Sequence, residues 1–297
     1  MSDLKTLIEE ELALPVDPRV GGFAASIAAQ YGDASKAVLF YGSCLRTTRL
    51  DGQMLDFYLI VSSYEEAYGK SWLVKANKLL PPNVFPAEHD GLVAKVAVLS
   101  EDDFYKLNRP EASAVSVWAR FAQPSRLVWS ADEAAKSTAI EAIKGAPMTL
   151  FALTLPMLGG ETHSISDIWR QGFELTYGAE LRAERGNRPG SVVDADPQRY
   201  DRFGLATLEE RKANPEARLS VIAAGKRWKK LRRNGKLLTL ARLAKASGTY
   251  AGGIDYLAWK INRHAGTDYE IKPWQRKWPI LGAIVMLPRL LIGGAIK

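Results

Sequence analysis

A small turn followed by an acidic strand residue is the clearest chemical pattern in the sequence. The apolar run 36–41 stops at Gly42-Ser43, and the next apolar run, 54–61, carries a single charge, Asp56. A glycine-serine turn lets backbone N–H groups and a hydroxyl reach phosphate oxygens. A carboxylate on the facing strand can then hold Mg²⁺ against the same phosphates. The alternative interpretation is an ordinary turn beside an ion-paired aspartate.

A β-sheet flanked by helices is needed to bring these residues together. The hydrophobic spacing predicts strands over 36–41, 54–61 and 92–99. It predicts helices over 4–13, 19–31 and 64–79, a short helix from 101, and further helices over 111–122, 131–143, 147–157, 165–184 and 197–209. A break is expected at 187–190, and the segment from 225 is helical in pattern. The fold class is therefore expected to be α/β (α+β).

Several segments, in order, resemble one enzyme family. Polymerase-β-type nucleotidyltransferases place a Gly-Ser turn at the end of one strand and carboxylates on the next. Leu39-Phe-Tyr-Gly-Ser43 and Met54-Leu-Asp-Phe57 resemble, more closely, the start of the mitochondrial-type phosphatidate cytidylyltransferases, the peripheral CDP-diacylglycerol synthases first known as translocator-maintenance proteins. Segments 90–100, 118–124 and 176–182 are similar to later segments of that family, so the resemblance covers roughly 39–203. Like the family, the chain has no second carboxylate two residues after Asp56, where Tyr58 stands.

The resemblance implies a Mg²⁺-dependent reaction of CTP with phosphatidic acid that gives CDP-diacylglycerol and pyrophosphate. It assigns Gly42 and Ser43 to the triphosphate and Asp56 to the metal. Lys95 and Arg120 match two cations of the family and would neutralise phosphate charge. Without the family, a single strand lysine such as Lys95 is more often surface-facing, and Arg120 could equally belong to a structural ion pair.

The second metal ligand is left open by the sequence. Glu180 stands where the family has aspartate, and it is either a metal ligand or the ion-pair partner of Arg182. Asp51, in the loop between the first two strands, is a further candidate ligand. Cys44 and Ala179 replace glycines of the family pattern. Two other functions stay open, namely a nucleotidyltransferase with another acceptor and a catalytically inactive scaffold at a membrane.

The charge is unevenly distributed along the chain. The formal net charge is +7, but residues 225–297 hold 16 Lys and Arg against three acids. A basic run around Trp228 and an apolar end after Trp278 are typical of a segment that docks on an anionic membrane surface. Nucleic acid is the less favoured partner because it would not require the apolar end. The alternative is a core-packed helix with a solvated basic face. The expected membrane-binding residues are Lys226, Arg227, Trp228, Lys229, Lys230, Arg232, Arg233, Trp278 and Arg289.

Length and composition bound the remaining possibilities. The chain of 297 residues has room for about two domains, and we expect a nucleotidyltransferase domain over 1–130. A helical, winged-helix-like domain over 131–224 and the docking tail over 225–297 would follow it. The single cysteine excludes a disulfide framework and a thiolate zinc cluster. Neither a signal peptide nor a run of ~20 uncharged apolar residues is visible. We therefore expect a peripheral protein on the cytoplasmic face of the inner membrane, or on the matrix side in an organelle.

Overall fold

The computed structural model describes residues 3–47, 49–159, 163–180, 189–213 and 219–249, together with 255, 258, 262, 270–278, 281–282 and 285. Its strands are β1 Ser35–Tyr41, β2 Met54–Val61, β3 Asn83–His89, β4 Leu92–Ser100 and β5 Ser125–Ser130. The helices of the first part are α1 Leu4–Leu12, α2 Pro18–Ala29, α3 Ser43–Thr47, α4 Tyr64–Tyr68, α5 Trp72–Leu79, α6 Glu101–Leu107 and α7 Trp118–Phe121. Those that follow are α8 Glu133–Thr154, α9 Ile165–Tyr177, α10 Pro189–Asp194, α11 Pro197–Ala213, α12 Val221–Thr249 and α14 Pro273–Lys277. The fold is therefore α+β, as expected from the sequence.

One five-stranded mixed sheet lies at the centre of the first 130 residues. Its strand order is β3-β4-β2-β1-β5, and β2 with β4 is the parallel pair while the other pairs are antiparallel. Asp56 on β2 lies in register with Tyr41 on β1 and with Lys95 on β4. Side chains in register on neighbouring strands point to the same face of a sheet. These three residues therefore share one face.

The two faces of the sheet belong to different hydrophobic clusters. One face packs against α2 through residues such as Val38, Phe40 and Phe57. The other, which includes Leu39 and Tyr58, belongs to a cluster that continues through helices α1, α6, α7, α8, α9, α10 and α11 to α12. Asp56 alternates with Leu55 and Phe57 along β2 and so lies on the second face. One core thus joins residues of all three segments expected from the sequence.

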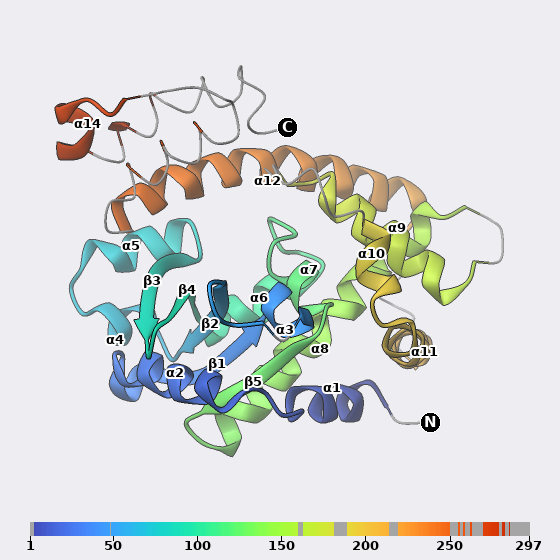
Figure 1. The fold of residues 1–297 in the computed structure, drawn as a ribbon. Coiled ribbons are helices and arrows are strands. Elements are labelled where there is room, and N and C mark those ends of the chain that lie inside the picture. Colours follow the sequence, from blue (N-terminus) through green and yellow to red (C-terminus); the bar gives the residue numbers. More distant parts are fainter. Residues whose placement is uncertain are drawn as a thin grey trace.

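Helix α12 is the longest helix that the structure describes, and it passes over the sheet domain (Figure 1). It begins at Val221, so the boundary expected at 225 lies inside it. Its first half is fixed by Trp228, which is buried, packs edge-on against Trp118 of α7 and donates a hydrogen bond to the Leu153 carbonyl at 2.9 Å. Its other end contacts β3. The helix therefore connects the helical part of the molecule with the sheet.

Several predicted elements differ from the observed ones. The helix expected over 64–79 is two helices, separated at Gly69 with its positive φ of 60°. The helices expected over 131–143 and 147–157 form one helix, α8, with Pro147 inside it and buried neighbours on both sides. The helices expected over 111–122 and 165–184 are shorter, and α10 begins within the break expected at 187–190. Strands β3 and β5 were not expected at all.

Candidate functional site

The turn after β1 brings the backbone against Asp56. Gly42 has a φ of +96°, and a Cβ built on it would lie 2.9 Å from Oδ2 of Asp56. Glycine is the residue that adopts this conformation without steric cost and allows such a close approach. Ser43 follows as the exposed first residue of α3. The turn and the acidic strand residue predicted from the sequence are therefore in contact range.

Cys44 is a buried neighbour of this turn. Its thiol donates to the Met54 carbonyl at 3.6 Å. Burial raises the pKa of the thiol, and the nearby charge of Asp56 acts in the same direction. A thiol with a raised pKa is a poor nucleophile at neutral pH. Cys44 therefore packs the loop, in the place where the resembling family has glycine.

Arg120 of α7 faces the same side of the sheet as Asp56. Its pKa is raised overall: burial lowers it, but the acidic groups of Tyr58, Tyr41, Glu180 and Asp56 raise it more. Burial also raises the pKa values of both tyrosines, whose rings lie 5.2 Å apart. Arg120 is therefore a permanently charged group in a partly buried, largely aromatic environment.

Glu180 reaches this region because the end of α9 packs tightly on α12. A Cβ built on Gly235 of α12 would overlap the carbonyl oxygen of Ala179, so glycine is required for this approach. Ala179 is fully buried there and Glu180 is partly buried. The charge of Glu180 acts on the pKa values of both Arg120 and Arg242. Its other predicted partner, Arg182, lies outside the described residues.

Arg242 of α12 is the residue of this region that sequence reasoning missed. Its Nε donates to the Pro81 carbonyl at 2.9 Å and its Nη1 to the Ser116 hydroxyl at 3.0 Å. Arg120 donates to the backbone carbonyl of the same Ser116. A signal was present, because positions 228, 231, 235, 238, 242 and 245 are spaced by three and four residues in turn, as on one face of a helix.

Lys95 lies beside Asp56 in strand register and is partly buried. Among the described residues it forms no ion pair within 4 Å and no hydrogen bond of its side chain. Its side chain lies on the face of the sheet that carries Asp56. Partial burial and a position beside Asp56 do not favour the alternative that Lys95 is a surface lysine.

Asp51 is separate from this group of residues. Its carboxylate pairs with the Arg19 guanidinium of α2 at 2.8 Å, and its side chain is 80% exposed. Helix α2 covers the sheet face opposite to the one that carries Asp56. The prediction that Asp51 is a metal ligand is therefore not supported by its contacts.

The described residues contain no group of three or more His, Cys, Asp or Glu side chains that could hold a metal by themselves. Mg²⁺ does not require such a cage, since it is commonly bound by one or two carboxylates together with substrate phosphates and water. Asp56 and Glu180 are both close enough to Arg120 to affect its pKa. These two carboxylates are consistent with a site that Mg²⁺ would share with a polyphosphate.

The residues expected to bind a membrane divide into two sets. Lys226, Lys229, Lys230, Arg232 and Arg233 are exposed, and we call this set the outer basic face of α12. Trp228 is only 1% exposed, so its assignment to a membrane surface is wrong; the apolar stripe of the helix packs it into the core. Arg227 turns toward the body and donates to the Pro110 carbonyl at 2.9 Å and to that of Ala112.

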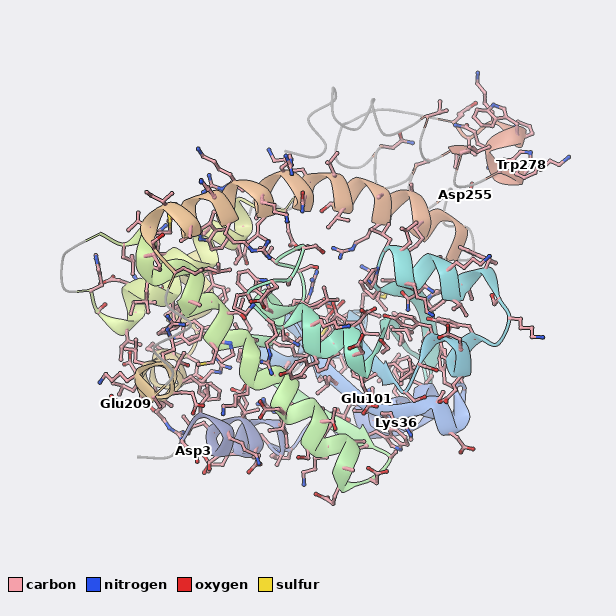
Figure 2. The ribbon with its side chains drawn as sticks, turned by 180° about the vertical axis from the view of Figure 1, so that it is seen from behind. Asp3, Lys36, Glu101, Glu209, Asp255 and Trp278 are labelled. Carbon is pink, nitrogen blue, oxygen red and sulfur yellow. The ribbon has the colours of Figure 1, made fainter. Side chains whose placement is uncertain are left out.

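The apolar end of the chain is described only in part. Trp278 is 58% exposed, and Figure 2 shows it on the side of α12 that faces away from the sheet. Arg289 lies outside the described residues. Within the described part of the chain, no helix has the length and apolar character needed to cross a bilayer.

Comparisons with known proteins add no family assignment. No protein-family model matches the chain, and no curated protein matches it.

The arrangement combines a glycine turn, two carboxylates and three cations around one face of a sheet. Backbone N–H groups and cations bind phosphate oxygens, while carboxylates bind the metal that accompanies polyphosphates. Among the described residues, this group contains no histidine, and the pKa of its cysteine is raised by burial. The chemistry open to such a site is the alignment of anionic groups and the stabilisation of charge, as in phosphoryl or nucleotidyl transfer.

Proposed function

We propose that this protein is a Mg²⁺-dependent nucleotidyltransferase, and specifically a phosphatidate cytidylyltransferase. The observation that carries the proposal is the contact of the Gly42 turn with Asp56, 2.9 Å from a Cβ position at Gly42 to Oδ2. A backbone turn this close to a carboxylate suits a triphosphate and the metal ion that it carries. The choice of cytosine and of a lipid acceptor rests on the family resemblance.

The chain's own residues would act mainly by binding and orientation. The turn at Gly42 and Ser43 would hold the triphosphate, and Asp56 with Glu180 would hold Mg²⁺. Bound there, the ion would neutralise phosphate charge and stabilise the leaving group. Lys95 and Arg120 would neutralise the remaining charge and keep two anionic substrates side by side.

The proposed reaction needs no strong general base. A phosphomonoester has its second pKa near ~6, so phosphatidic acid already carries a nucleophilic oxygen at neutral pH. That oxygen attacks the α-phosphorus of CTP, the bond from this phosphorus to the bridging oxygen breaks, and pyrophosphate leaves with the electron pair. In the part of the chain that the structure describes, the residues around Asp56 include no histidine, which is compatible with this route.

The outer basic face of α12 would hold the protein on the membrane that contains the acceptor. Its five exposed cations lie along one helix, and the exposed Trp278 follows in the same C-terminal part. Basic residues near an anionic leaflet each contribute about 1 kcal/mol to binding. A peripheral mode of binding agrees with the lack of a membrane-crossing helix in the described residues.

The proposal is tested by incubating the full chain with Mg²⁺, vesicles that contain phosphatidic acid, and each of four nucleoside triphosphates labelled at the α-phosphate. We expect label in lipid from CTP alone, and none when EDTA is present. Label from ATP, or transfer to a soluble acceptor only, would favour a different nucleotidyltransferase. No transfer from any nucleotide would contradict the proposal and favour an inactive scaffold.

A further inference from the structure

The inward stripe of α12 changes from apolar to cationic along the helix. Trp228 and Leu231 are buried in the core, and Gly235 allows the close contact with Ala179. Further along the same stripe, Arg242 is partly buried and Lys245 is 8% exposed. Buried charges are costly unless they are paired or bind a charged ligand. The positions of these two cations therefore require a partner on the inner side of α12.

Lys245 has partners of its own within the chain. Its Nζ donates to the Pro82 carbonyl at 2.7 Å and to the Leu80 carbonyl. These carbonyls lie in the segment between α5 and β3, so the lysine joins α12 to the sheet domain. These two backbone hydrogen bonds explain the burial of Lys245, and we call this pair of contacts a structural latch.

Arg242 differs from Lys245 because it shares a hydrogen-bonding residue, Ser116, with the guanidinium of Arg120. It donates to the Ser116 hydroxyl at 3.0 Å, while Arg120 donates to the carbonyl of the same residue. Burial lowers the pKa of Arg242, Tyr58 and Glu180 raise it, and Arg120 lowers it by a smaller contribution. Two like charges at one buried serine repel each other, and Glu180 offsets this repulsion in part. A phosphate bound between the two guanidinium groups would offset it further.

We propose that Arg242 and Arg120 form a pair that binds a phosphate group of the substrate, with α12 supplying one guanidinium and α7 the other. Arginine fits this role because its planar fork can donate two parallel hydrogen bonds to one phosphate group. The charges of Asp56 and Glu180 act on Arg120. A metal ion held by these two carboxylates would neutralise their charge, and the positive charge of the arginines would then attract the phosphate. The inference rests on the proposed function and adds a residue from the C-terminal segment to its substrate site.

The same phosphate chemistry could come from the nucleotide or from the lipid. The test therefore measures binding of two probes to the full chain by calorimetry without membranes. One probe is CTP with Mg²⁺ and the other is a short-chain, water-soluble phosphatidic acid. Arg242→Gln is compared with Arg242→Lys, which keeps the charge but loses the fork. A charge-assisted hydrogen bond corresponds to roughly tenfold to hundredfold in affinity.

Two control variants separate binding from structure. Lys245→Met removes a latch to the same loop but leaves both arginines, and Arg202→Gln removes a guanidinium that is 61% exposed on α11. Thermal unfolding without ligand reports any structural loss in each variant. The Arg242→Lys variant keeps the inference testable if the glutamine variant does not fold.

We expect Arg242→Gln to weaken at least one probe by at least about tenfold, with a smaller loss for Arg242→Lys and less than about threefold for both controls. The probe that is weakened identifies the source of the phosphate. Unchanged affinities for both probes would overturn the inference, and so would equal losses in Arg242→Gln and Lys245→Met. Arg242-dependent binding without any nucleotide transfer would retain the inference and reject the proposed function.

Discussion

The Gly42 backbone lies so close to the Asp56 carboxylate that a single added methyl group would stand 2.9 Å from Oδ2. This relationship joins the end of β1 to the middle of the candidate site, and it depends on a residue without a side chain. The carboxylate and the turn are thus one structural unit.

Gly42→Ala should disturb this unit in two ways. The positive φ of +96° strains any residue with a Cβ, and the new methyl group displaces the carboxylate. We expect a loss of stability of about 1–3 kcal/mol and a loss of kcat/KM of at least about a hundredfold, because small misplacements near a reacting centre have effects of that size. Thermal unfolding and initial rates measure the two effects.

Gly52→Ala is the matched control for strain alone. Gly52 also has a positive φ, +70°, but a Cβ there would meet nothing within 4 Å. Gly52→Ala should lose about as much stability as Gly42→Ala and keep the rate of nucleotidyl transfer of the wild type. Equal losses of rate in both variants would show that the contact with Asp56 is not what matters.

The docking of α12 on the end of α9 depends on Gly235. Gly235→Ala would place a methyl group on the Ala179 carbonyl, so the helix would have to shift. Overpacking of this kind typically costs about 1–3 kcal/mol in stability. We expect a lower midpoint of thermal unfolding and weaker nucleotide binding, because Glu180 moves with its neighbour.

Gly225→Ala on the same helix is the control. Nothing lies within 4 Å of a Cβ at Gly225, so its effect is limited to helix propensity. Alanine is favoured over glycine in helices by roughly 1 kcal/mol, which predicts a slightly more stable protein. A loss of stability in Gly235→Ala together with a gain in Gly225→Ala would support the contact with Ala179. A change of stability in the same direction in both variants would contradict it.

Lys245 should make stability depend on pH. Burial lowers the pKa of its amine to about 7, with Arg242 acting in the same direction. An unfolded chain has a lysine pKa near ~10.4. Between these values the unfolded state binds a proton that the folded state lacks, so the free energy of unfolding rises with pH. Below about pH 7 both states are protonated and this dependence disappears.

The comparison of wild type with Lys245→Met isolates this dependence. The stability of wild type relative to the variant should rise by up to about 1.4 kcal/mol per pH unit between about pH 7 and about pH 10. Urea denaturation across this range measures it, with Lys236→Met as an exposed control on the same helix. A difference that stays constant with pH would show that Lys245 keeps an ordinary pKa.

The outer basic face of α12 should set the affinity for anionic membranes. The double variant Lys229→Glu with Lys230→Glu should bind vesicles containing phosphatidic acid at least about tenfold more weakly, since each lysine contributes about 1 kcal/mol. The double variant Lys136→Glu with Lys212→Glu changes the net charge equally on α8 and α11, and should bind as wild type does. Vesicle flotation measures both, and equal retention would reject α12 as the membrane-binding surface.

The sequence was most informative where chemistry and core packing coincide. The runs that form β1, β2 and β4 are buried and nearly continuous in apolar residues. Gly42 ends the first run, and Asp56 is the single charge in the second. Strands β3 and β5 are the two edges of the sheet. Edge strands tolerate residues such as Pro86 and Arg126, which hide the strand pattern.

Tertiary contacts decided the features that the sequence did not predict. Pro147 reads as a helix boundary, yet buried packing on both sides holds α8 together through it. Arg242 follows a dense run of cations over 226–236, most of which are exposed and favour a membrane interpretation. Only its place on the stripe that begins with Trp228 shows that it points to the sheet.

The most direct test of the central claim is nucleotidyl transfer by Asp56→Asn. This change removes the charge that would hold Mg²⁺ and keeps the size of the side chain. Asp102→Asn is the matched control, because Asp102 is 68% exposed and pairs with Lys106 on the surface of α6. We expect Asp56→Asn to fold as wild type does and to lose at least about a hundredfold in CTP-dependent formation of CDP-diacylglycerol, while Asp102→Asn keeps its rate. Wild-type activity in Asp56→Asn would show that the Asp56 carboxylate is not needed for nucleotidyl transfer.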